Sequence, residues 1–297
     1  MTNNLEDIAR LAGVSRSTVS RVVNAHPNVS EYTRRRVLKV IAEQNFRPNL
    51  AARALVTKKT QTLSLVIPQA SAMIFTDPYF SLLIQGIMLT ANERNYAVML
   101  WMGNSTEEEE RFTQRVLNNS FFDALIIASS VDNDPLIPRL LDAHFPFLLV
   151  GKPVHDGIHY VDADNEQGAY DAVAHLLRLG YQRIGTITGP LNMVAGRARL
   201  TAFKRAHQAA ERRIDPSLIV QGSFTEQTGQ QQAKVLLAQG VDAIFAASDM
   251  MAIGALRAIS EAGLRVPDDV ALVGYDDLAM STSVTPQLTT VRQPIQA

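Results

Sequence analysis

The chain has 297 residues, of which 46% are hydrophobic and 19% charged, and it contains no cysteine. This composition is typical of a globular protein with two or three domains, and it excludes disulfides, cysteine nucleophiles and thiolate metal sites. The formal net charge of −1 hides an uneven distribution. Residues 1–60 carry eleven Lys or Arg against four Asp or Glu, a net of +7, whereas the rest of the chain carries −8. A basic head on an acidic body indicates a polyanionic partner for the head, with a solvated basic face as the alternative.

The first seven residues are polar and lack the charged start and apolar core of a signal peptide. No apolar run approaches the ~18 residues that a membrane-spanning helix requires. We therefore expect a cytoplasmic protein that has no membrane partner.

Three short helical patterns open the chain. A polar residue precedes each of them and is expected to cap it: Asn4 before a helix over 5–12, Ser15 before a helix that ends near Asn24, and Ser30 before a third. Gly13 and Val14 supply the turn between the first two helices.

The outer face of the second helix carries Ser, Arg, Ser, Thr, Ser and Arg. A helix fits the major groove of DNA, and short polar side chains let it approach the base edges. Arg16 and Arg21 can donate paired hydrogen bonds to guanine or contact phosphates. The head is therefore predicted to be a helix-turn-helix DNA-binding domain, with a small helical bundle of incidental polarity as the alternative.

A hinge is predicted after the head. Residues 49–56 have high helix propensity, but eight residues are fewer than the ~12–15 that an isolated helix needs in water, so this helix needs a partner to form. Residues 57–62 are polar and indicate a linker at a domain boundary.

From residue 63 onward, short apolar strands alternate with amphipathic helices. One set of expected strands covers 63–67, 97–101, 124–128 and 147–150, and a second covers 184–188, 219–221, 243–247 and 270–275. This alternation predicts parallel sheets covered by helices on both faces, arranged as two doubly wound α/β lobes. Ligands bind outside the carboxyl ends of such strands, so we expect a binding cleft between the lobes.

Motifs along the whole chain resemble one family of bacterial regulators. In chain order they are residues 5–24, 28–30, 33–34, 46–49, 51–55, 77–80, 162–165, 197–203, 248–254, 273–277 and 288–293. Together they resemble the lactose-repressor/galactose-repressor family of transcription regulators. The ordered combination is far more specific than the head alone.

The resemblance implies a repressor that binds a near-palindromic operator as a homodimer, with its DNA affinity controlled by a small effector, a sugar or sugar phosphate. It implies sensor lobes of the periplasmic-binding-protein type. The expected organisation is a small all-α helix-turn-helix head (1–48), a hinge helix and linker (49–61), and a sensor (62–297) with an N-lobe (62–160 plus 291–297) and a C-lobe (161–290).

The resemblance also implies which residues contact DNA. Arg16, Ser17 and Arg21 would read bases, and Leu55 would enter the minor groove as an apolar wedge. The full expected set is Leu5, Ser15, Arg16, Ser17, Ser20, Arg21, Asn24, Ser30, Thr33, Asn49, Ala52 and Leu55.

In the sensor, Arg199 and Asp276 match positions that hold sugar hydroxyls, for which a guanidinium fork and a carboxylate supply fixed donors and acceptors. Phe224 matches a position where a ring stacks on the ligand. The alternatives are a surface arginine, a turn aspartate and a core phenylalanine. The full expected set of ligand contacts is Tyr79, Phe80, Ser129, Asp164, Arg199, Phe224, Ser248 and Asp276.

Two other function classes compete with that of a regulator. A transport-type sugar-binding protein shares the two-lobed architecture, but the basic head and the absent signal peptide disfavour it. An enzyme needs a nucleophile, an acid–base pair or a cofactor loop; the six histidines are scattered and no Gly-rich phosphate loop is present. We expect no enzymatic activity, no cofactor and no metal. Relatives add a further helix and strand beyond Ala297, so the resemblance implies a truncated C-terminus.

Overall fold

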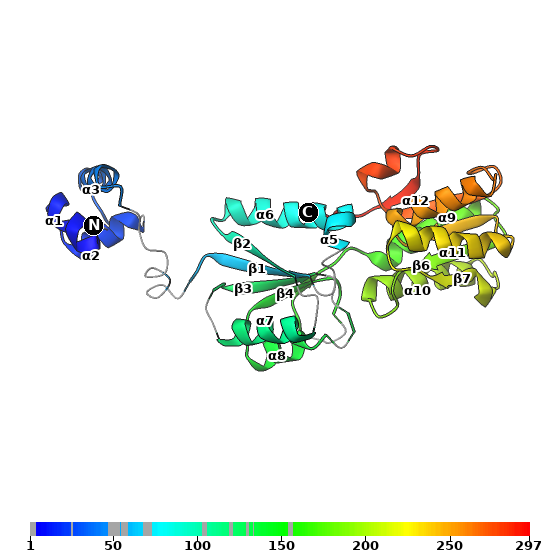
Figure 1. Cartoon of the computed structure of the whole chain (residues 1–297), viewed down its shortest axis with the longest axis horizontal. Helices are drawn as coiled ribbons and strands as arrows, with labels where there is room; N and C mark the ends of the chain where they lie inside the picture. The colour runs from blue at the N-terminus through cyan, green and yellow to red at the C-terminus, as the bar shows by residue number, and fades with distance from the viewer. Residues whose placement is uncertain are drawn as a thin grey trace. The chain divides into compact units, whose positions relative to one another are not determined.

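A computed structural model describes residues 4–24, 26–46, 54, 59–67, 73–102, 106–118, 121–128, 131–132, 134–153 and 157–297. The chain divides into two compact units, Met1–Thr60 and Gln61–Ala297 (Figure 1). None of the helices in the described part of the chain combines the length and the apolar character that a membrane crossing requires.

The first unit contains three helices: α1 (Leu5–Ala12), α2 (Arg16–Val23) and α3 (Glu31–Glu43). The predicted N-caps are confirmed: Asn4, Ser15 and Ser30 each accept a hydrogen bond from a backbone N–H in the first turn of their helix. Such caps satisfy donors that have no partner within the helix. Gly13 ends α1 with a φ of 59°, a conformation that glycine adopts without strain. The unit's small core is formed by Ile8, Ala9, Ala12, Val19, Val22 and Val37.

The first lobe of the second unit has a five-stranded parallel sheet in the order β2-β1-β3-β4-β5. Its strands are β1 (Thr62–Ile67), β2 (Ala97–Met102), β3 (Ala124–Ala128), β4 (Phe147–Val150) and β5 (Tyr160–Val161). Helix α6 (Pro78–Glu93), preceded by the short α5 (Met73–Thr76), covers one face. Helices α7 (Thr106–Asn118) and α8 (Leu136–Asp142) cover the other (Figure 1).

The second lobe repeats this design, with the strand order β10-β9-β8-β6-β7. Its strands are β6 (Ile184–Thr188), β7 (Ile219–Gln221), β8 (Ala243–Ala246), β9 (Ala271–Asp276) and β10 (Thr289–Arg292). One face packs against α9 (Asn165–Arg178) and α10 (Val194–Ala209), the other against α11 (Glu226–Ala238) and α12 (Asp249–Glu261). Short 3₁₀ turns, η1 (Pro216–Leu218) and η2 (Ala279–Thr282), precede β7 and β10.

The predicted fold class is confirmed: an all-α head is followed by two parallel-sheet α/β lobes. The described sheets have five strands each instead of the expected four. Strands β5 and β10 were missed because the first has only two residues and the second reads Thr-Thr-Val-Arg, with no continuous apolar run. Both lie at sheet edges, where a strand needs less apolar surface.

The strand pairing places the boundaries between the lobes one or two residues away from the expected positions. Val161 pairs within the first sheet, and Val291 and Arg292 pair within the second. The chain therefore returns to the first lobe only after Arg292, and Ile295 then packs against the cluster beneath α6.

Two glycines let α11 and α12 pack closely. A Cβ on Gly229 would overlap the Met251 backbone, and one on Gly254 would overlap the Glu226 carbonyl. This close approach fixes the N-terminal ends of both helices beside the carboxyl ends of the strands.

Candidate functional site

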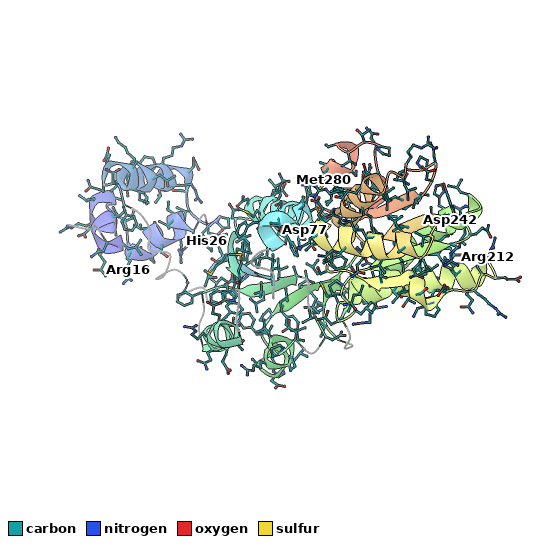
Figure 2. All side chains as sticks on the ribbon, turned by 45° about the vertical axis from the view of Figure 1, so that its right-hand side comes forward. Arg16, His26, Asp77, Arg212, Asp242 and Met280 are labelled. Atoms are coloured by element: carbon teal, nitrogen blue, oxygen red, sulfur yellow. The ribbon has the colours of Figure 1, made fainter. Side chains whose placement is uncertain are left out.

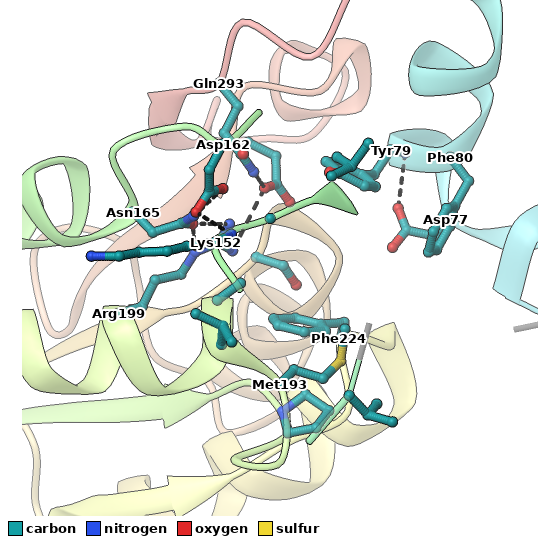
Figure 3. Close-up of a pocket in the computed structure, with 18 of the residues that line it drawn as sticks. Asp77, Tyr79, Phe80, Lys152, Asp162, Asn165, Met193, Arg199, Phe224 and Gln293 are labelled. Atoms are coloured by element: carbon teal, nitrogen blue, oxygen red, sulfur yellow. Dashed lines mark hydrogen bonds and ion pairs between the residues drawn. The ribbon is translucent and has the colours of Figure 1, made fainter. Parts of the chain in front are cut away.

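A cavity of about 230 Å³ in the second unit is lined by residues from both lobes (Figure 3). The first lobe contributes residues at the start of α6, and the second contributes residues that follow β6, β7, β8 and β9. This is the place that parallel-sheet topology predicts for a ligand. Six of the residues predicted from the sequence line this cavity: Tyr79, Phe80, Arg199, Phe224, Ser248 and Asp276.

Arg199 lies on α10 and is only 5% exposed. Its Nε and Nη2 donate to Oδ1 of Asn165 at 3.0 and 2.8 Å, and its Nη1 donates to the Ala247 carbonyl. The guanidinium carbon lies 3.8 Å from the centre of the Tyr275 ring, a cation–π contact. A buried guanidinium held from three directions has one orientation, and its remaining N–H groups are available to a ligand.

Asp276 ends β9 beside Arg199. One carboxylate oxygen lies 3.7 Å from Nη1 of Arg199 and accepts a 2.5 Å hydrogen bond from Nε2 of Gln293. Burial raises the pKa of Asp276 to about 7, and the Arg199 charge opposes only part of this shift. The backbone φ of 125° is unusual for a residue other than glycine, and such strain is typical of functional sites.

Asp249 lies behind Asp276, where it is fully buried. It accepts hydrogen bonds from Oγ1 of Thr290 at 2.5 Å and from the Leu278 backbone N–H at 2.8 Å. Burial raises the pKa of Asp249 to about 6. These contacts tie the loop after β9 to α12 and β10, and so they position the Asp276 carboxylate.

Phe224 forms one wall of the cavity and has a φ of 61°, which is rare for an aromatic residue. Its ring packs against the backbone of Gly189, where any Cβ would overlap the ring. The Arg199 guanidinium lies 5.9 Å from the ring centre. The ring is therefore held in place before a ligand arrives.

The first lobe presents its side chains from the start of α6, opposite Arg199 and Asn165 (Figure 3). Asp77 caps α6 by accepting the Tyr79 N–H at 3.0 Å, and burial raises the pKa of Asp77. Tyr79 and Phe80 pack edge to face with ring centres 5.4 Å apart. Burial raises the pKa of Tyr79 to about 12, so its hydroxyl stays protonated and can donate to a ligand.

Two of the predicted ligand contacts, Asp164 and Ser129, are not among the described residues that line the cavity. Asp164 does not line the cavity; its carboxylate caps α9 by accepting the Gln167 N–H at 2.9 Å, and we withdraw it as a ligand contact. Ser129 lies outside the described residues. Ser248 lines the cavity, although its hydroxyl already caps α12 by accepting the Met251 N–H.

Sequence reasoning missed Asn165, Asp162 and Gln293. Asn165 orients Arg199, and it donates to Asp162 at 3.0 Å. Asp162 also accepts the Lys152 N–H, and burial raises its pKa. The Asp-Ala-Asp-Asn motif at 162–165 contains the signal, but the sequence alone does not show which of its polar residues face the cavity.

One ion pair joins the two lobes close to the cavity. Arg197 on α10 pairs with Asp132 through both guanidinium nitrogens. Beside this pair, Val131 and Met193 form an antiparallel bridge, and the Asp132 N–H donates to the Asn192 carbonyl at 2.8 Å. Because Val131 and Met193 also line the cavity, a ligand there contacts the segments that connect the lobes.

In the first unit, α2 presents the predicted base-reading side chains. Arg16 projects from the surface of the unit and pairs loosely with Glu6 at 3.4 Å (Figure 2). Arg34 and Arg36 donate to the backbone carbonyls of His26 and Gly13, so they hold the helix arrangement together. In the described part of this unit, the Arg21 side chain makes no hydrogen bond or ion pair, which leaves it available to a nucleic acid.

The other predicted DNA contacts divide by burial. Ser17 and Asn24 are exposed, as are the capping residues Ser15 and Ser30. Leu5, Ser20 and Thr33 are half-buried, and Leu5 packs against the core of the unit. Asn49, Ala52 and Leu55 lie outside the described residues.

Sequence comparisons identify the two halves of this architecture. The family described as "Bacterial regulatory proteins, lacI family" matches residues 4–49, and the one described as "Periplasmic binding protein-like domain" matches residues 173–297. The HTH-type transcriptional regulator CelR of Thermobifida fusca is 39% identical over 98% of this chain and 87% of its own length. The HTH-type transcriptional regulator AscG of Escherichia coli (strain K12) is 34% identical over 99% of this chain and 88% of its own.

Solved structures give the same result. A complex of the transcriptional regulator CelR with cellobiose matches with a TM-score of 0.76 at 37% identity, covering 99% of this chain and 89% of that one. A lac repressor dimer bound to operator and the anti-inducer ONPF matches with a TM-score of 0.85 at 31% identity, covering 100% of this chain and 89% of that one.

The buried carboxylates predict a pH-dependent stability. An aspartate whose pKa is raised on folding, as in Asp276 and Asp249, binds its proton more tightly in the folded state, so the free energy of unfolding should fall as the pH rises from about 5 to 8. The Asp276→Asn variant should have a shallower fall, because its side chain does not titrate. Melting temperatures measured by calorimetry across this range test the prediction. Asp171→Asn, an exposed change on α9, should keep the wild-type slope, and parallel curves for the wild type and Asp276→Asn would contradict the assignment.

Proposed function

The chain belongs to the LacI family of bacterial regulatory proteins and is a DNA-binding transcription regulator, and we propose that it is a repressor whose operator affinity is controlled by a neutral sugar in the sensor cavity. The resemblance inferred from the motifs is thereby confirmed. The chain is a regulator of this class and not an enzyme. We place it in the cytoplasm, where a bacterial regulator meets its DNA.

One observation carries the choice of ligand: Arg199 is buried, oriented and still has N–H groups to offer, beside the Asp276 carboxylate. A sugar hydroxyl both donates and accepts hydrogen bonds, so adjacent hydroxyls match a guanidinium and a carboxylate side by side. Phe224 adds an aromatic face for the C–H surface of a ring. The cellobiose complex of the similar regulator CelR supports the same ligand class.

The charge of the cavity favours a neutral sugar over a sugar phosphate. Its lining carries three carboxylates, Asp77, Asp162 and Asp276, against the cations of Arg199 and Lys152. The Arg199 guanidinium is already close to one of those carboxylates. The cavity therefore offers no uncompensated positive charge to a phosphate, whose own charge would be costly to bury there.

A homodimer is part of the proposal. Met88 and Leu89 on α6, and Leu100 on the edge strand β2, are 38–57% exposed, and the two elements are packed side by side. An apolar surface of this kind is typical of a protein interface. A second copy is its proposed occupant, and the dimeric lac repressor structure supports this choice.

The proposed DNA contacts remain those of the resemblance. Arg16, Ser17 and Arg21 would read bases from α2, whereas Asn49, Ala52 and the Leu55 wedge would act from the hinge. A hinge that orders only when two copies meet on DNA would connect the sensor to the operator.

The effector assignment is tested by replacing the two residues that would hold the sugar. A thermal-shift screen of the full chain first identifies the sugar, and fluorescence anisotropy then measures operator affinity with and without it. Arg199→Ala and Asp276→Ala should each abolish the effect of the sugar, because each removes a buried partner of the sugar hydroxyls, while operator affinity without sugar stays within about threefold.

Arg205→Ala is the matched control, because Arg205 lies exposed on the same helix and pairs with Glu166. It should respond to the sugar like the wild type. If no sugar changes operator affinity in the wild type, the ligand class is wrong. If Arg199→Ala and Asp276→Ala respond normally, the site is wrong.

Arg21 is the sharpest test of the DNA-binding helix. Arg21→Ala should weaken operator binding by about 1–3 kcal/mol and reduce the preference for operator over a scrambled duplex, because a base contact is lost. Arg35→Ala removes the same charge from α3, where Arg35 pairs with Glu31, and should preserve the preference. Equal preference in the wild type and Arg21→Ala, measured by anisotropy competition, would remove Arg21 from the base-reading set.

The proposed dimer surface is tested with a charge. Leu89→Glu should shift the protein from dimer to monomer in sedimentation velocity, because a carboxylate in an apolar interface stays desolvated and unpaired. Leu179→Glu introduces the same charge at another exposed leucine, in the second lobe, and should leave the dimer intact. A dimeric Leu89→Glu variant would show that the interface lies elsewhere.

A further inference from the structure

A second cavity of about 490 Å³ adjoins the first. The two share Asp77 and Phe224 in their linings. The remaining walls of this outer cavity come mainly from the first turns of α11, with Glu226, Gln227 and Gln230, and from Met250 and Arg257 of α12. Two cavities that share lining residues lie next to each other at the carboxyl ends of the strands.

Phe224 lines both cavities, and its conformation is costly. A φ of 61° is strained for an aromatic residue, and such strain persists only where the surroundings enforce it. Gly189 and its bare backbone supply the space that the ring needs. The ring also packs against the core of the second lobe, so it is held in place where it lines both cavities.

The sizes of the cavities restrict how a ligand can be shared between them. The inner cavity, at about 230 Å³, is smaller than the range of about 300–1,000 Å³ of sites that enclose a drug-sized ligand. It suits a single sugar ring. A longer ligand that uses Arg199 and Asp276 extends beyond this cavity, and the outer cavity, which shares Phe224 with it, is a neighbouring space that can receive it.

The chemistry of the outer cavity also suits a sugar. Gln227 and Gln230 are amides, which both donate and accept hydrogen bonds. Arg257 is paired with Glu226 at 2.7 Å, so its charge is balanced. With Asp77 on the other side, the outer cavity offers polar partners and no uncompensated positive charge for a phosphate.

We propose that the effector is a neutral oligosaccharide of at least two units, with one ring in the inner cavity against Arg199 and Asp276 and the next in the outer cavity against Gln227 and Gln230. This inference rests on the proposed sugar-binding function. Phe224 separates the two subsites and contacts both rings. The outer subsite then decides the length of the sugar, and the inner subsite decides whether a sugar binds at all.

The test is calorimetric titration of the full chain with matched sugars: glucose against cellobiose, maltose and gentiobiose, and galactose against lactose and melibiose. At least one disaccharide should bind 30-fold or more tightly than either of its component monosaccharides. Gln227→Trp fills the outer cavity without touching Arg199 or Asp276. It should weaken that disaccharide at least tenfold and leave the affinity for the monosaccharide within twofold.

Gln231→Trp is the matched control, because Gln231 is exposed on the same helix and lines neither cavity. It should bind both sugars like the wild type. A monosaccharide that binds as tightly as every disaccharide, or a disaccharide that Gln227→Trp binds normally, would overturn the outer subsite while leaving sugar binding in place. If none of these sugars binds the wild type, the outer subsite and the proposed ligand class both fail.

Discussion

The sensor site depends on one buried guanidinium. Arg199 is removed from water, and a buried charge is tolerated only when it is paired and hydrogen-bonded. Its partners come from four places in the second lobe: the start of α9, the end of β8, and both the face and the end of β9. The arginine therefore joins the carboxyl ends of this sheet, and its free N–H groups point where those ends meet.

The carboxylates around Arg199 outnumber the cations that could balance them. The Arg199 guanidinium lowers the pKa of Asp276, but repulsion from the nearby carboxylates of Asp249 and Asp77 raises it. In the free protein the ionised form of Asp276 is therefore unfavourable, as its raised pKa indicates. A ligand whose hydroxyls donate to that carboxylate relieves the cost, so binding strength is drawn from an interaction that the empty site satisfies poorly. An arrangement that lowers the stability of the free protein thereby increases its affinity for such a ligand.

Local patterns predicted the fold, and motifs predicted six of the twenty described residues that line the cavity. Caps such as Ser15 and the strand–helix alternation are short-range features that a sequence displays directly. Arg199 and Asp276 were found through motifs, whereas Asn165 was missed because its role arises from a contact 34 residues away along the chain. Its neighbour Asp164 was chosen in its place, since a sequence does not reveal that this carboxylate is engaged in capping a helix. The strand β10 was missed because edge strands need no apolar run.

Control of DNA binding by the cavity requires a difference in ligand affinity between two arrangements of the lobes. The contacts that join the lobes close to the cavity supply a physical basis for that difference. Asp132 and Arg197 bring opposite charges from the two lobes together, and the bridge between Val131 and Met193 places lining residues on both sides of the same junction. These contacts set the distance between the two lobes. A ligand large enough to reach both lobes either fits this distance or forces the lobes into another arrangement. In the first case it adds its own contacts to theirs and favours the existing arrangement, and in the second it competes with them.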